Sequence, residues 1–566
     1  MKTLKLQLKL IIFFFIFFNF FNFVFAKNIE KFSNSKHLSN YFSGLIAINN
    51  NQYKISYNYF KSLNNLEESH YSYSQYYLYS QIALNKFKDA ANYSRGLERR
   101  QLDSFESNLV AGIYNLKTGN FEQAKIYFEK LKNHSQPGTM QALISITLNN
   151  WSNFNNINSA LLKLKSMPDK FENIKNIQEV FAHCFFDSTQ TDTMFEKLTS
   201  NSKIGYSRYN FFYVNYLNSK KKEKKAKVIL KSSLNLYPKN LILNQLQNDI
   251  SQQQKQYSDV FNCKKIDHVI AEMFYIIANS LSSTSNYIAS NFYLNLAKYL
   301  NPKFPSFDVL FAENFEVLEK HQEALKIYKR IKKLGSHYDW HASKRIASIL
   351  KAQEKKDQSV QYLKNVFLKI KNPTIHEIFD YADFLKNNEQ FKDSIEYYSK
   401  LINSINKKHS LYPLALDGRG VAYERTNQWT KAEIDLINSL KISPDNAYVI
   451  NYLAYSWIEK EVNIDKSLKM LKKANQLRPN DGYIVDSLGW ALFKLNRYKE
   501  AKKYMQLAVK LMASDPVIND HFADVLWMNN NSLQARYYWK YVLKLEKTEN
   551  KLKNKIERKL LFGLKG

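Results

Sequence analysis

The chain has 566 residues, of which 45% are hydrophobic, 13 are glycine and 10 are proline. These values exclude collagen-like and low-complexity chains and favour long helices, because glycine and proline both weaken a helix. The formal charge of +31 allows a nucleic acid or an anionic membrane as partner, although the joint overuse of Lys, Asn, Ile, Phe and Tyr is also what a genome rich in A and T produces without such a partner.

Residues 1–26 have the layout of a secretory signal peptide. Three lysines precede the apolar run Leu10–Phe21, and the small residue Ala26 offers a cleavage site before Lys27. Asn19 and Asn22 interrupt the apolar stretch and leave it short of the about 20 residues that a spanning helix needs, so an uncleaved membrane anchor is the less favoured alternative. We expect a periplasmic protein, possible association with a membrane surface, and a mature charge of +28 after loss of three lysines from +31.

Small residues recur in pairs that are 12 positions apart between Ser39 and Leu545. Fixed-period similarity of this kind is typical of stacked helix hairpins, in which a small residue on each helix lets the two backbones approach. The pairs are Gly44–Ser56, Gly112–Ala124, Val214–Ala226, Ala278–Ser290, Ala312–Ala324, Ala347–Ser359, Ala382–Ser394, Gly420–Ala432, Gly489–Ala501 and Ala523–Ala535.

The clearest hairpin is Gly482–Ala513, in which an apolar helical stripe breaks at Asn496 and a second stripe starts after Tyr498. We expect an all-α fold, a right-handed superhelical solenoid in which each hairpin contacts only its neighbours. After the leader, the expected segments are N-terminal repeats over 27–131, degenerate helical repeats with a possible hinge over 132–203, middle repeats over 204–302, well-formed repeats over 303–546, and a capping helix and tail over 547–566.

The capping helix is predicted from Leu552, Ile556, Leu560 and Leu564, which follow one another at one helical turn. Their apolar side chains would cover the exposed core of the last repeat, as the terminal units of solenoids must.

Cys184 and Cys263 are the only cysteines of the chain. An even number in an exported protein permits a disulfide. The two residues are 79 positions apart, about two repeats, whereas a disulfide needs Cα atoms within about 7 Å. We therefore favour two ordinary thiols.

The C-terminal units resemble tetratricopeptide repeats, which have about 34 residues, paired antiparallel helices and small residues at the close contacts. The strings YERTNQWTKAE, NYLAYSW, DGYIVDSLGWALFKLNRYKEA and DPVINDHFADVLW, with the closing KLLFGL, resemble exported tetratricopeptide proteins of alphaproteobacteria. Ala523 departs from that group, which tends to have glycine there, and lysine replaces many of its other charged residues. The resemblance implies a scaffold for protein–protein interaction and supplies no catalytic residues.

Signatures of catalysis and of metal or nucleotide binding (HExxH, CxxC, GxSxG, the P-loop and GxGxxG) do not occur. His337 and His341 could share a helical face as zinc ligands, but no third ligand accompanies them, and we expect a surface turn and a helix start. His521 beside Asp520 and Asp524 could be an oriented base, but it lacks a nucleophile, and we expect a surface histidine. The sequence predicts neither an enzyme nor a cofactor, and no nucleic-acid partner.

The first helix of each hairpin should line the concave face of the solenoid. Short polar and large aromatic side chains recur there in the last three repeats, and such residues suit peptide binding. The candidate groove residues are Asn451, Tyr455, Asp486, Trp490, Asp520, Asp524 and Trp527. The alternative is that these polar side chains bridge to the next repeat and fix its stacking.

The function that the sequence favours is a non-enzymatic exported scaffold, which binds peptides or partner helices in its concave groove during envelope or outer-membrane assembly. The competing function is a basic adaptor that contacts an anionic membrane surface or another polyanion. The sequence leaves the partner's identity and the oligomeric state open.

Overall fold

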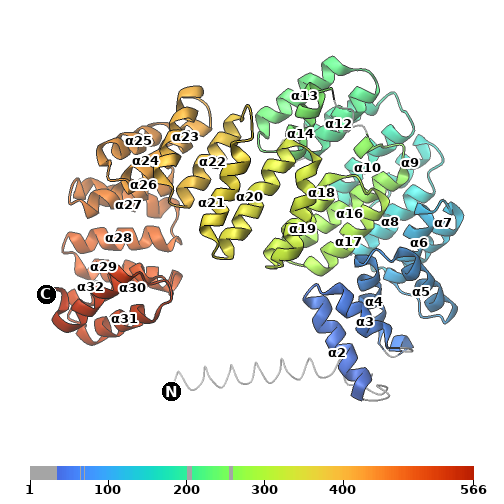
Figure 1. The fold of residues 1–566 in the computed structure, drawn as a ribbon. Helices are drawn as coiled ribbons and strands as arrows, with labels where there is room; N and C mark the ends of the chain where they lie inside the picture. Colours follow the sequence, from blue (N-terminus) through green and yellow to red (C-terminus); the bar gives the residue numbers. More distant parts are fainter. Residues whose placement is uncertain (1–34, 64–65, 69, 201–206, 254–258, 566) are drawn as a thin grey trace. The chain divides into compact units, whose positions relative to one another are not determined.

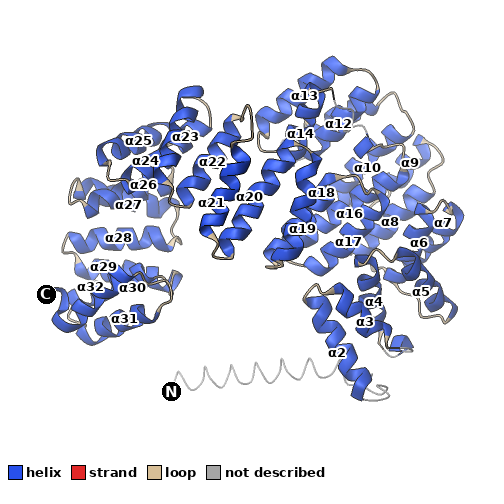
Figure 2. Cartoon of the chain, in the orientation of Figure 1, coloured by secondary structure: helices blue, strands red, loops and turns tan. Residues whose placement is uncertain are grey.

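The computed structural model describes residues 35–63, 66–68, 70–200, 207–253 and 259–565, and these residues form helices joined by short turns, without a strand (Figures 1 and 2). The predicted all-α solenoid is confirmed. The predicted signal peptide lies outside the described residues. Among the described helices, none is both long and apolar enough to cross a membrane.

Contacts divide the chain into two compact units, unit 1 over Met1–Lys355 and unit 2 over Lys356–Gly566. The α-helices of unit 1 are α2 Ser35–Asn49, α3 Tyr53–Lys61, α4 Tyr71–Ala83, α5 Phe87–Arg99, α6 Phe105–Lys117, α7 Phe121–Lys130, α8 Met140–Ser152, α9 Ile157–Lys165, α10 Glu172–Phe185, α11 Thr191–Thr199, α12 Ser207–Ser219, α13 Glu223–Leu236, α14 Leu241–Ser251, α16 Ile266–Ser283, α17 Tyr287–Leu300, α18 Pro305–Val317, α19 His321–Ile331 and α20 Ser336–Ala352. Those of unit 2 are α21 Lys356–Phe367, α22 Ile375–Asn387, α23 Phe391–Ser404, α24 Leu411–Arg425, α25 Trp429–Ile442, α26 Ala447–Glu459, α27 Ile464–Leu477, α28 Gly482–Lys494, α29 Tyr498–Leu511, α30 Pro516–Met528, α31 Ser532–Lys544 and α32 Asn550–Phe562.

The small-residue pairs lie where the sequence places them. All twenty residues are buried, and in nine of the pairs one member lies on each of the two packed helices of a hairpin. At two of these positions, a Cβ added to Gly44 or Gly112 would lie 2.5 Å from the ring of Phe60 or Phe128. The 12-residue spacing is therefore the packing rule of the fold.

The turn inside a hairpin uses a left-handed residue that is usually not glycine. Asn496 has φ of 57°, and the next amide, of Arg497, donates to the carbonyl oxygen of Leu492 at 2.9 Å. Asn530 repeats this turn with φ of 62°. Asn tolerates the left-handed region better than most residues with a side chain, and the bond from the following amide closes the end of the helix. The chain thus makes its hairpins with few glycines.

Unit 1 contradicts the expectation that each hairpin contacts only its neighbours. Helix α17 packs against α4 and α6, and α16 packs against α8, all first helices of much earlier hairpins. The rings of Phe87 and Tyr299 stack with their centroids 3.7 Å apart, and Lys117 Nζ donates to the Leu300 carbonyl oxygen at 2.6 Å. Residues His268–Phe274 of α16 are buried without a break, and five of these seven residues are apolar, so this part of the helix is covered on every side.

Cys184 on α10 and Cys263, just before α16, form a disulfide with their Cα atoms 6.0 Å apart. The prediction of two ordinary thiols is wrong. It assumed that units two repeats apart cannot meet, whereas α16 and the segment before it lie against earlier helices. The predicted hinge over 132–203 lies inside unit 1 and stays a prediction.

In unit 2 the last helix packs on the repeat before it. Ile556 of α32 is fully buried in a hydrophobic cluster that extends back to Ala454, and Leu552, Leu560 and Leu564 pack against that cluster. Helix α32 thus covers the apolar side of the last hairpin, α30–α31 (Figure 1).

Candidate functional site

In unit 2 several first helices of successive hairpins contact one another directly. Helix α22 contacts α24, α26 contacts α28, and α28 contacts α30, whereas the second helices pack mainly on their own first helix and on the next one. The candidate residues from the sequence lie on three of these first helices, α26, α28 and α30. The structure therefore allows the groove hypothesis and the stacking hypothesis to be compared residue by residue.

Asn451 and Tyr455, on α26, are half-buried. The Asn451 Oδ1 atom is buried and, among the described residues, accepts no hydrogen bond. Burial raises the pKa of the Tyr455 hydroxyl, and the carboxylates of Glu459 and Asp486 raise it further. Tyr455 therefore stays neutral and can donate a hydrogen bond.

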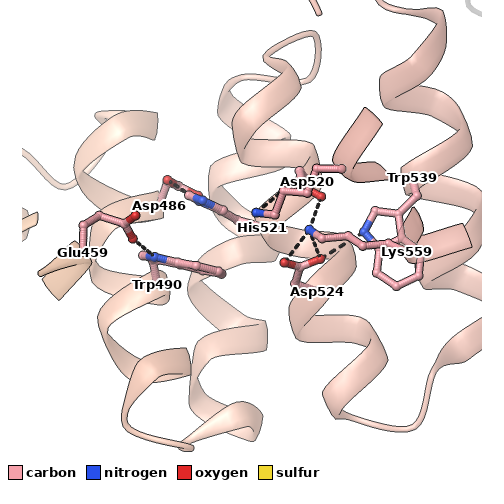
Figure 3. A network of polar contacts seen from close by, with 9 residues as sticks. Glu459, Asp486, Trp490, Asp520, His521, Asp524, Trp539 and Lys559 are labelled. Atoms are coloured by element: carbon pink, nitrogen blue, oxygen red, sulfur yellow. Dashed lines mark hydrogen bonds and ion pairs between the residues drawn. The ribbon is translucent and has the colours of Figure 1, made fainter. Parts of the chain in front are cut away.

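Trp490, on α28, is 7% exposed and binds both neighbouring first helices. Its Nε1 donates to Glu459 Oε1 of α26 at 2.6 Å, and its ring stacks on the His521 imidazole of α30 with the centroids 4.0 Å apart (Figure 3). One side chain thus ties three hairpins together, as the stacking alternative predicted.

Asp486 and His521 form the second link between α28 and α30. The His521 Nδ1 atom lies 3.1 Å from both Asp486 oxygens, and the exposed fractions of His521 and Asp486 are 6% and 5%. The prediction of a surface histidine is wrong, because the 35-residue spacing places His521 opposite Asp486 on the next first helix. Burial lowers the pKa of His521, but Asp486, with Asp520 and Asp524, outweighs that effect and leaves the pKa raised.

Asp520 and Asp524, on α30, bind a lysine of the capping helix. Lys559 Nζ of α32 lies 2.6 Å from Asp520 Oδ1 and 2.6 and 2.7 Å from the Asp524 oxygens, and Trp539 Nε1 donates to Asp524 Oδ1 at 3.0 Å (Figure 3). Burial and the neighbouring Asp520 raise the pKa of Asp524, against the opposing effect of Lys559. Lys559 is itself 6% exposed, so the three charges form a closed group inside the fold.

Trp527 is half-buried at the end of α30. Its indole packs against Gly563, where an added Cβ would lie 2.3 Å from the ring, and the Arg536 guanidinium lies 5.5 Å from the ring centroid. Of the seven candidates, Asp486, Trp490, Asp520 and Asp524 are thus buried and engaged by this chain's own side chains. Binding of a partner by these four residues stays a prediction.

The structure shows a set of exposed side chains on the first helices of unit 2 that sequence reasoning missed. Leu414, Tyr448, Tyr483 and Val517 occupy the first turns of α24, α26, α28 and α30 and are 42%, 54%, 55% and 46% exposed. They are 34, 35 and 34 positions apart, one in each repeat. This spacing could have revealed them, because a large apolar residue that recurs at the repeat period without being buried has no role in the core. We call these four residues the apolar row.

Neighbouring repeats orient the two tyrosines of the apolar row. The Arg478 guanidinium lies 5.1 Å from the ring centroid of Tyr448, and the Tyr483 hydroxyl donates to Asp515 Oδ2 at 3.4 Å. Both contacts hold rings that remain more than half exposed. Preorganised aromatic rings lose little conformational entropy when a partner binds.

The described residues hold no group of three potential metal ligands. His337 and His341 lie in the first turns of α20 and are half-buried, at the helix start that the sequence predicted. The His337 amide donates to Gln245 Oε1 at 3.1 Å, so α14 holds this helix start in place.

Comparison with known proteins agrees with the repeat assignment. A tetratricopeptide-repeat family model matches residues 316–548. The TPR repeat-containing protein PA4667 of Pseudomonas aeruginosa is 27% identical over 132 residues, which are 23% of this chain and 21% of that protein, so the match spans about a fifth of the relative's length. Residues 316–548 are thus similar to tetratricopeptide repeats.

Two solved structures resemble about a third of the chain. MamA from Desulfovibrio magneticus RS-1 is 15% identical, with a TM-score of 0.27, over 31% of this chain and 97% of that one. The protein TTC0263 of Thermus thermophilus, described as a thermophilic TPR protein, is 14% identical, with a TM-score of 0.29, over 33% of this chain and 100% of that one.

Proposed function

We propose that this chain is a non-enzymatic scaffold that binds an extended segment of a partner protein along the apolar row of unit 2. Tetratricopeptide repeats generally mediate protein–protein interaction, and residues 316–548 match that family. The observation that carries the proposal is the apolar row itself. It presents one exposed large apolar side chain on the first helix of each of four successive repeats.

The partner's chemistry follows from the spacing and from the side chains beside the row. An extended peptide can cross successive first helices, and its apolar side chains would contact Leu414, Tyr448, Tyr483 and Val517 in turn. Asn451 and Tyr455 are half-buried one to two turns further along α26, and the Asn451 amide nitrogen and the Tyr455 hydroxyl would donate hydrogen bonds to the peptide backbone. The buried contacts of Trp490 with Glu459 and His521 hold the first helices α26, α28 and α30 together.

The test is affinity capture with the full chain. Tyr448→Ser combined with Tyr483→Ser removes the two central rings and should weaken partner capture at least tenfold, because exposed aromatic anchors dominate interface energy. Ile434→Ser is the matched control, since Ile434 is 54% exposed on the second helix α25. Equal capture by the double variant and by the control would refute the proposal.

Export to the periplasm and a role in envelope or outer-membrane assembly also belong to this proposal. They are supported by the signal-peptide layout of residues 1–26 and by the resemblance to exported tetratricopeptide proteins of alphaproteobacteria. Cleavage near Ala26, detected by mass spectrometry of the N-terminus of the mature protein, tests the export step.

A second candidate function is contact with an anionic membrane surface. It is favoured by the mature charge of +28 and by an exposed apolar and basic surface on α31 and α32. Salt separates the two candidates, since a charge-driven contact weakens at high ionic strength, whereas apolar groove binding persists.

A further inference from the structure

Helices α31 and α32 present the most exposed apolar side chains of unit 2. Seven large apolar side chains of the described chain are exposed by 65% or more, and four of them lie on these two helices. They are Leu533 at 83%, Tyr537 at 66%, Leu561 at 72% and Phe562 at 65%. We call these four residues the α31–α32 cluster.

The four side chains lie at the same end of the helix pair. Leu533 and Tyr537 are one turn apart at the start of α31, and Leu561 and Phe562 are adjacent at the end of α32. Arg536 Nη1 donates to the carbonyl oxygen of Leu560, which places the start of α31 beside the end of α32. The cluster is therefore one surface feature formed by two helices.

The surroundings of the cluster are basic. Residues 532–565 contain ten Lys and Arg against three Glu, and α31 itself contains no acidic residue. Exposed cations continue both helices away from the cluster, Lys540 and Lys544 on α31 and Lys551 and Arg558 on α32. These exposed cations are separate from the Lys559 group, which Asp520 and Asp524 neutralise inside the fold.

We propose that the α31–α32 cluster docks on an anionic phospholipid bilayer. The leucine, tyrosine and phenylalanine side chains would enter the boundary between head groups and acyl chains, and the lysine and arginine side chains would bind lipid phosphates. A basic helix with exposed Leu and aromatic residues has the composition of a segment that lies in the membrane interface. This inference rests on the second candidate function and names its site, and it is independent of the apolar row.

Geometry favours a lipid surface over a second copy of the chain. A two-fold contact through this cluster would bring identical basic surfaces together, and like charges across an interface oppose association. The exposed fractions of 65% to 83% also mean that the four side chains project into solvent instead of lining a depression. Projecting apolar side chains insert into a fluid bilayer without a complementary pocket.

The experiment places an environment-sensitive fluorophore on single cysteines in the full chain. Phe562→Cys and Tyr537→Cys report on the cluster, because the native cysteines are joined in a disulfide and do not react. Leu236→Cys is the matched control, since Leu236 is 74% exposed at the end of the lysine-rich α13 in unit 1. Each labelled protein is titrated with phosphatidylglycerol–phosphatidylcholine vesicles and with phosphatidylcholine vesicles.

We expect a blue shift of emission at positions 537 and 562 with anionic vesicles only, reversal of the shift by high salt, and no shift at position 236. Lys551→Gln should weaken vesicle binding about fivefold, as expected for one cation near an anionic surface. Three results overturn the proposal: no shift at position 562, equal shifts at all three positions, or a shift without lipid that grows with protein concentration and so reports self-association. Vesicle flotation without a shift at position 562 overturns this site while the second candidate function survives.

Discussion

Replacing Lys559 by methionine tests whether the buried charge group holds the end of unit 2 together. Methionine keeps most of the apolar stem of the lysine but removes its charge. Asp520 and Asp524, which are 2% and 3% exposed, then lose the cation that lies 2.6 Å from each of them. Removing one partner from a buried ion pair typically costs about 3–5 kcal/mol, because a buried charge is left without compensation. The opening equilibrium of α32 should therefore rise by about two to three and a half powers of ten.

Lys555 provides the matched control for this experiment. Its side chain is 57% exposed, and its Nζ lies 3.7 Å from Asp520 Oδ2. Exposed ion pairs contribute at most about 1 kcal/mol, so Lys555→Met should change little. Amide hydrogen exchange of α30 and α32 in the full chain measures both variants, because exchange resolves local opening from global unfolding. Equal protection of α32 in Lys559→Met and Lys555→Met at neutral pH would refute the assigned role of Lys559.

The same variant has a predictable pH dependence. Burial and Asp520 already raise the pKa of Asp524 in the presence of Lys559, and removal of the lysine raises it further. An acid whose pKa is raised by folding favours the folded state most when it is protonated. The destabilisation of α32 in Lys559→Met should therefore become smaller as the pH falls toward the range in which Asp524 is protonated. If the destabilisation of α32 is the same at every pH, its cause is lost packing and not the uncompensated charge.

Three further predictions follow from other parts of the fold. Gly112→Ala should destabilise unit 1 by more than about 1 kcal/mol in denaturant unfolding, because the added methyl meets an aromatic ring at 2.5 Å. Gly96→Ala is the control: its methyl meets nothing within 4 Å, so the change should be neutral or stabilising by up to about 1 kcal/mol. Equal effects of the two substitutions would contradict the role of small residues in the close packing of a hairpin. Cys184→Ser with Cys263→Ser should cost about 2–4 kcal/mol and raise hydrogen exchange around α10 and α16 in unit 1. Unchanged exchange there would contradict the stabilising role of the disulfide. Because folding raises the pKa of His521, the stability that its protonation adds is fully present below pH 6.5 and is lost as the pH rises through the raised pKa. His521→Gln should therefore make the free energy of unfolding fall less steeply over that pH range. An unchanged pH profile would contradict the pairing of His521 with Asp486.

The sequence predicts the local structure of this protein better than its long-range contacts. The spacing of small residues identified both helices of each hairpin, because close packing inside a hairpin depends on residues only 12 positions apart. The position of Ile556 in the capping helix followed in the same way from one-turn spacing. These features depend on neighbours in the sequence and can be derived from one repeat at a time.

The disulfide and the buried histidine could not be derived in that way. Cys184 meets Cys263 only because α16 and α17 return against the early first helices, and no repeat pattern encodes that return. The available signal was the apolar character of α16, in which Val269, Ile270 and Ala271 are followed by Met273 and Phe274 across a single Glu272, since such a helix must be covered on most sides. His521 was misplaced because its partner, Asp486, is one repeat away, so that the pair is visible only when corresponding positions of adjacent repeats are compared.

The prediction of the groove was also limited because contacts between different repeats are not visible in the sequence of one repeat. Aspartate and tryptophan side chains suit peptide binding and repeat stacking equally well, and this applies to Asp486, Trp490, Asp520 and Asp524. Only the positions of His521 and Lys559 show that these side chains are engaged within the chain.

The central claim is that a partner protein lies along the apolar row, and site-specific photocrosslinking in the native cells tests it most directly. A photoreactive phenylalanine analogue replaces Tyr448 or Tyr483 and, as the control, Ile434, which is equally exposed on a second helix. We predict that both row positions capture the same protein, at neighbouring positions of a single segment, and that position 434 captures nothing in common with them. Capture of that protein from position 434 with equal yield, or of unrelated proteins from positions 448 and 483, would contradict the claim.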